Sequence, residues 1–132
     1  MNPPIITAIF AAILGLIAAG LTVNVIMHRV RLGVENGDGG QPQMAQAIRA
    51  HGNFAEHVPL ALILIGSAEM LIMRSWIIYA LGTTLLVARL LSMIGLTRSL
   101  GPSFPRQAGA GLTILVISVT SILILCREFG LI

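Results

Sequence analysis

The chain has little charge, almost no cysteine and few aromatic residues, and each shortage excludes a class of protein. Only 10% of its 132 residues are charged, whereas a soluble domain usually carries about 25%, so the charge is too sparse to cover a water-facing surface. The single cysteine, Cys126, excludes an internal disulfide. Lysine is absent, and the eight arginines are dispersed without the interleaved aromatic residues of a nucleic-acid-binding patch. We therefore expect no nucleic-acid partner.

Apolar sequence fills the chain instead. Hydrophobic residues make up 56% of it, and the mean hydropathy is +0.94. A membrane-crossing helix needs about 20 mostly apolar residues, and the chain contains four such runs. We therefore expect an all-α membrane protein, a single domain over residues 1–132 with a bundle of four transmembrane helices. The expected spans are 4–27, 44–73, 75–96 and 107–126.

The arginines are unevenly divided between the two ends of these spans. Five flank the first and third loops and two flank the opposite side, namely Arg29, Arg31, Arg49, Arg98 and Arg106 against Arg74 and Arg127. Loops that face the cytoplasm carry an excess of basic residues. The pattern predicts a multi-pass protein of the inner (plasma) membrane, with loops one and three in the cytoplasm and both termini outside.

Small residues recur at four-residue spacing in the first span, in the pairs Ala8 and Ala12, Ala11 and Gly15, and Gly15 and Ala19. Such spacing lets helix backbones approach closely in lipid. It favours a helix–helix contact on this face.

Two charged residues, Glu69 and Arg89, fall inside the expected spans. Charged side chains at membrane depth are rare, because they are costly to insert, and they often mark ion or substrate paths. They are compatible with a small transporter or channel subunit. A structural ion pair between Glu69 and Arg89 explains both residues more simply.

Polar chemistry is concentrated at the start of the second span. Arg49, Asn53 and Glu56 stand at positions i, i+4 and i+7, so on a helix they lie within about 60° of one another, while His51 points away. One interpretation is a buried Arg49–Glu56 ion pair, bridged by Asn53, that fixes helix packing. The other adds the nearby arginines and predicts an anion-binding site with one acceptor for an amine, because guanidinium groups suit carboxylates.

The motifs Asp38-Gly39-Gly40, Arg49-Ala50-His51-Gly52-Asn53-Phe54-Ala55-Glu56 and Pro59-Leu60 resemble the signature of the MAPEG family in its bacterial form. The name stands for membrane-associated proteins in eicosanoid and glutathione metabolism. The resemblance implies four-helix protomers that assemble as a homotrimer. It also implies that glutathione, as a co-substrate, lies between neighbouring subunits near the cytoplasmic face, with no metal.

The resemblance also implies roles for particular residues. Arg49, Asn53 and Glu56 match residues that bind glutathione, and Arg106 is the catalytic candidate that helps to hold the thiol as thiolate. An arginine at the end of span one, Arg31 or Arg29, belongs to the same site. His57 stands where many members have tyrosine. It either replaces the missing hydroxyl in binding glutathione or faces the lipid headgroups.

The expected function is therefore that of a glutathione-binding membrane protein, a glutathione S-transferase or peroxidase acting on lipophilic electrophiles. The alternative is a non-catalytic membrane scaffold with the same fold that binds a lipid or another ligand. Ser92 and Leu96 stand where the transferases have ring residues around the ligand, and this departure favours the alternative.

Overall fold

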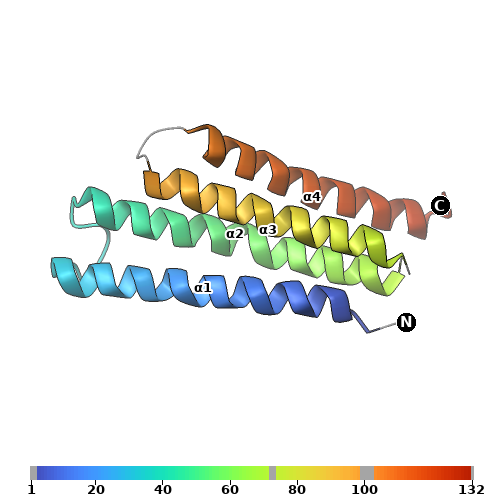
Figure 1. The fold of residues 1–132 in the computed structure, drawn as a ribbon, viewed down its shortest axis with the longest axis horizontal. Helices are drawn as coiled ribbons and strands as arrows, with labels where there is room; N and C mark the ends of the chain where they lie inside the picture. Colours follow the sequence, from blue (N-terminus) through green and yellow to red (C-terminus); the bar gives the residue numbers. More distant parts are fainter. Residues whose placement is uncertain (1–2, 72–73, 99–102, 132) are drawn as a thin grey trace.

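The computed structural model describes residues 3–71, 74–98 and 103–131, except for the side chains of residues 97 and 98. The described residues form four α-helices, α1 Ile5–Leu32, α2 Pro42–Leu71, α3 Ser75–Arg98 and α4 Phe104–Glu128 (Figure 1). Each helix is long and apolar enough to cross a membrane. All four expected spans fall on these helices, although the expected end of the second span, at 73, lies outside the described residues.

The helices run in alternating directions, with α2 and α3 between α1 and α4 (Figure 1). The starts of α2 and α4 lie at one end of the bundle, which we call the loop end. The start of α1 and the end of α4 lie at the other end. The helix ends that flank loops one and three therefore share one end of the bundle, and the arginine-rich sequences gather there.

A narrow apolar core runs along the middle of the bundle. All four helices contribute to it, and its most buried members include Leu14, Ala61, Ile65, Leu85 and Val116. Large apolar side chains such as Leu16, Ile63, Ile114 and Phe129 remain exposed on the outside. Such an outer surface suits lipid and not water.

Glycines bring α3 and α4 together at the loop end. A Cβ atom on Gly109 would lie 2.3 Å from Oγ of Ser92 and 2.5 Å from the carbonyl oxygen of Ala88. A Cβ atom on Gly95 would lie 2.6 Å from the backbone nitrogen of Arg106. Because neither glycine has a side chain, α3 and α4 pack closely here, and Arg106 lies close to α3.

The small-residue face of α1 makes no such contact. Ala8, Ala12 and Ala19 are exposed, and a Cβ atom on Gly15 would meet nothing within 4 Å. The described helices of this chain do not use this face for packing, because α1 packs against them through its larger residues, Phe10, Leu14 and Leu21.

α1 continues past the expected boundary at residue 27 and ends at Leu32, where it is capped by Gly33 with φ 64° and ψ 30°. That left-handed conformation suits glycine. The guanidinium of Arg29 donates hydrogen bonds to the carbonyl oxygens of Val34, Glu35 and Gly37, at 3.3, 3.1 and 3.2 Å. Arg29 thus organises the first loop.

The expected ion pair between Glu69 and Arg89 is wrong, because each residue has other partners. The Glu69 carboxylate accepts hydrogen bonds from the backbone amides of Ile6 and Thr7, at 2.8 and 2.7 Å, and from the Thr7 hydroxyl at 2.6 Å. The first amides of a helix have no partner within it and carry partial positive charge. Glu69 satisfies them at the start of α1, which removes the main support for a transport path.

Candidate functional site

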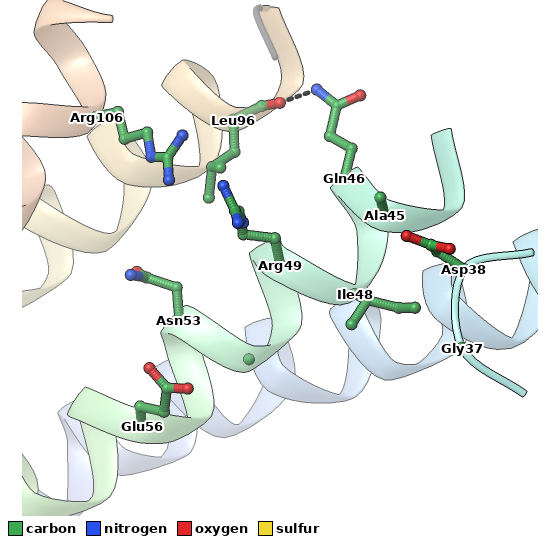
Figure 2. Close-up of a pocket in the computed structure, with 11 residues that line it drawn as sticks. Gly37, Asp38, Ala45, Gln46, Ile48, Arg49, Asn53, Glu56, Leu96 and Arg106 are labelled. Atoms are coloured by element: carbon green, nitrogen blue, oxygen red, sulfur yellow. Dashed lines mark hydrogen bonds between the residues drawn. The ribbon is translucent and has the colours of Figure 1, made fainter. Parts of the chain in front are cut away.

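A cleft of about 770 Å³ opens at the loop end of the bundle (Figure 2). It lies between one side of α2, the end of loop one, the last turns of α3 and the start of α4. Its lining residues are Gly37, Asp38, Ala45, Gln46, Ile48, Arg49, Gly52, Asn53, Glu56, Leu96 and Arg106. Its volume falls in the range of small-molecule sites.

The helical spacing brings the predicted stripe together. Arg49, Asn53 and Glu56 project from α2 along the same side, and Arg106 reaches toward this space from α4 (Figure 2). His51 faces the other way, where its Nε2 atom lies 3.1 Å from the hydroxyl of Thr22 on α1. The predicted division of the two faces of α2 is confirmed.

Charged groups in the cleft are available to a ligand. In residues 3–71, 74–98 and 103–131, the side chains of Arg49, Glu56 and Arg106 form no hydrogen bond or ion pair with protein. The interpretation of Arg49 and Glu56 as a buried ion pair is therefore wrong for the described chain. Asp38 adds a second carboxylate, of which one oxygen accepts the Gly40 amide at 2.9 Å. The cleft thus offers two guanidinium groups and two carboxylates to a charged ligand.

Asn53 has a partner that the sequence interpretation did not assign. Arg89, which is only 1% exposed, donates from Nη1 to Oδ1 of Asn53 at 3.0 Å. Its Nη2 atom donates to the carbonyl oxygen of Gly109 at 3.2 Å and to the hydroxyl of Thr113. Asn53 was expected to donate and accept hydrogen bonds between Arg49 and Glu56. Its side-chain oxygen instead accepts a hydrogen bond from Arg89 on α3.

Three predicted site residues lie outside the cleft lining of this chain. Nδ1 of His57 lies 2.9 Å from the backbone oxygen of Asn53, so the ring bonds within its own helix. Arg29 is bound to the first loop, as described above, and Arg31 is exposed at the end of α1. The side chain of Arg98 lies outside the described residues.

Gln46 and Leu96 line the cleft, although the sequence interpretation assigned neither of them a role in binding. The side-chain amide of Gln46 donates to the carbonyl oxygen of Leu96, which joins α2 to α3 at the loop end. Gln46 precedes Arg49 by three residues, so the same helical periodicity extends to it. Leu96 was noted only as the replacement of a ring residue, and it does line the cleft.

Comparison with known proteins identifies the family. A sequence model of the MAPEG family matches residues 7–126. The chain belongs to the MAPEG family. It is also 32% identical over 90 residues to the inner membrane protein YecN of Escherichia coli strain K12 and to YecN of the O6:H1 strain CFT073. Those alignments cover 68% of this chain and 69% of each YecN protein.

The family assignment extends to every helix that lines the cleft. The matched region contains Arg49, Asn53 and Glu56 on α2, Leu96 on α3 and Arg106 on α4. Four apolar helices of span length and this match make the chain a multi-pass MAPEG membrane protein. The cleft therefore lies within the part of the chain that the family model matches.

Proposed function

We propose that this MAPEG protein binds glutathione in the loop-end cleft and uses it as a glutathione S-transferase or peroxidase on lipophilic electrophiles. The observation that carries the proposal is one cleft holding Arg49, Glu56 and Arg106 without partners among the described residues. Glutathione carries two carboxylates, one ammonium and one thiol. Arg49 and Arg106 suit its anionic groups, and Glu56 suits its ammonium.

The charges suggest how the ligand lies. Guanidinium groups bind carboxylates in a forked geometry, so Arg49 is assigned to a glutathione carboxylate. The Glu56 carboxylate is assigned to the ammonium. Arg106, which reaches in from α4, is left for the sulfur atom.

Arg106 has a chemical task in this arrangement. A free thiol has a pKa of about 8.5, and a nearby cation lowers it because it stabilises the thiolate. In transfer to an aryl halide, the thiolate attacks the ring carbon, a C–S bond forms, and the halide leaves with its bonding electrons. In peroxide reduction, the thiolate attacks the terminal oxygen of the hydroperoxide, the O–O bond breaks, and the alkoxide leaves and is protonated to the alcohol. The sulfur is then a sulfenic acid, and the thiol of a second glutathione attacks it to form the disulfide and release water.

The proposal includes an inner-membrane location, with the loop end in the cytoplasm. The YecN proteins, named as inner membrane proteins, support the first part, and the excess of arginine around loops one and three supports the second. We also propose the homotrimer that the family resemblance implies. In that assembly the exposed Arg31, at the end of α1, is the cation available to a neighbouring protomer's site.

Activity of the purified protein tests this proposal. Protein in detergent micelles is incubated with glutathione and either a chlorinated dinitrobenzene or a lipid hydroperoxide. Turnover that falls in Arg106→Gln and persists in Arg127→Gln, at the far end of the same helix, supports it. Failure of the wild-type protein to turn over any of several electrophiles at saturating glutathione would reject the enzymatic part.

One observation favours the non-catalytic alternative, a MAPEG scaffold that binds a lipid or a small anion. The described lining residues include no tyrosine, serine, histidine or cysteine, and Leu96 occupies the wall of the cleft at α3. A ligand that stays bound to the protein in native mass spectrometry, with no product formed on addition of electrophiles, would identify this function.

A further inference from the structure

We propose that Arg89 is a positioning residue for this site: it binds the side-chain oxygen of Asn53, so that Asn53 offers the cleft only N–H donors and selects an anionic group of the ligand. This inference rests on the proposed function for the identity of the ligand. It concerns a residue that does not line the cleft and that no ligand needs to touch.

The chemistry of arginine fixes the orientation of the asparagine. A guanidinium has five N–H donors and no acceptor, so the atom of Asn53 that lies 3.0 Å from Nη1 of Arg89 must be the amide oxygen. The amide nitrogen then occupies the other side of the group. Since Asn53 lines the cleft, its two N–H bonds are the part available there.

Arg89 itself has little freedom to move. It is 1% exposed, and its second nitrogen, Nη2, donates to the Gly109 carbonyl oxygen and the Thr113 hydroxyl on α4. The buried guanidinium therefore joins α2, α3 and α4 next to Asn53. Moving it would leave a buried charge without its acceptors, which is costly.

The backbone oxygen of Asn53 is also occupied. It lies 2.9 Å from Nδ1 of His57, and Nη1 of Arg89 donates to it at 3.5 Å. Both oxygens of Asn53 thus already accept hydrogen bonds within the protein, which favours the side-chain NH₂ group as the part of the residue that meets a ligand. Together with Arg49 and Arg106, Asn53 makes the central part of the cleft a donor surface, which suits a carboxylate or the thiolate.

The most direct test is the isosteric change Asn53→Asp. The new carboxylate keeps an acceptor for Arg89, so the fold is retained, but it replaces the cleft-facing N–H donors with an oxygen. Hydrogen bonds to charged groups are strong enough that their loss weakens binding by about tenfold or more. We expect glutathione affinity, measured by calorimetry, to fall by that factor while the thermal unfolding temperature stays near that of the wild type. Asn36→Asp adds the same charge to the exposed first loop and is the matched control.

A second pair of variants separates positioning from packing. If Arg89 acts through Asn53, then Asn53→Ala weakens glutathione binding strongly in the wild type and little in an Arg89→Lys background. If the losses of glutathione affinity caused by the two substitutions simply add, Arg89 affects binding only through the fold. Asn53→Asp protein that binds glutathione as tightly as the wild type would overturn the inference and leave the proposed function standing.

If the wild type binds no glutathione, the role of Arg89 can still be tested by an NMR measurement that needs no ligand. With ¹⁵N-labelled asparagine, the Asn53 side-chain NH₂ resonance is expected to shift in Arg89→Lys and to stay unchanged in Arg74→Lys, at the opposite end of the bundle. A shift without glutathione binding would reject the proposed function alone. An unchanged resonance in both variants would reject the role of Arg89.

Discussion

The Glu69 carboxylate accepts the backbone amide hydrogen of Thr7 at 2.7 Å and thereby ties the end of α2 to the start of α1. The two residues are 62 positions apart. The same carboxylate also receives the Ile6 amide and the Thr7 hydroxyl, so one side chain satisfies three donors. Because helix amides at an N-terminus attract negative charge, this contact both caps α1 and fixes it against the bundle.

Glu69→Ala is therefore expected to destabilise the protein without touching the cleft. It leaves buried donors unsatisfied, at a cost of about 1–3 kcal/mol for each group. We expect a lower unfolding temperature in detergent, followed by circular dichroism, with glutathione affinity retained in the protein that stays folded. Glu128→Ala, which removes an exposed carboxylate from the end of α4, is the control. Equal unfolding temperatures for the two variants would show that the α1 cap contributes nothing.

Gly109→Ala is expected to separate α3 from α4. The added Cβ atom would lie 2.3 Å from Oγ of Ser92, and overpacking of this kind typically costs about 1–3 kcal/mol. Gly111→Ala, two residues further along the same helix, meets nothing within 4 Å. The first variant should unfold at a lower temperature, and the second should unfold near the temperature of the wild type or slightly above it. Identical behaviour of the two would contradict the close packing of these helices.

Arg106→Gln is expected to change the pH dependence of any glutathione reaction. In the proposed complex the guanidinium would lower the pKa of the bound thiol, so its removal would raise that pKa toward the free value of about 8.5. The thiolate fraction at neutral pH then falls, and the rise of activity with pH moves to higher pH. Activity measured across the pH range would show this displacement, with Arg127→Gln as control. A loss of activity by the same factor at every pH would mean that Arg106 does not act on the thiol.

The sequence predicts the features within a single helix better than the contacts between helices. The four helices follow from runs of about 20 apolar residues. The shared face of Arg49, Asn53 and Glu56 follows from the helical repeat. Both are properties of a single helix, so no knowledge of packing is needed. The opposite direction of His51 was predictable for the same reason.

Partners between helices were harder to predict. Glu69 and Arg89 have opposite charges inside the expected spans. A prediction from charge alone therefore paired them with each other, and that pairing is wrong. The competing donors of Glu69 are backbone amides at the start of α1, which carry no signature in the sequence. Likewise, the partners of Arg89 are an amide, a carbonyl and a hydroxyl on two other helices. Their proximity depends on the close approach at Gly109, which only the packed bundle shows.

Calorimetric titration of glutathione into the purified protein tests the central claim most directly. The account predicts saturable binding to the wild type, and a loss of affinity of about tenfold or more in Arg49→Ala, since a charged hydrogen bond is removed. Arg74→Ala, at the opposite end of the bundle, should bind as the wild type does. Absence of binding to the wild type, or equal affinity of the wild type and Arg49→Ala, would contradict the assignment of the loop-end cleft as a glutathione site.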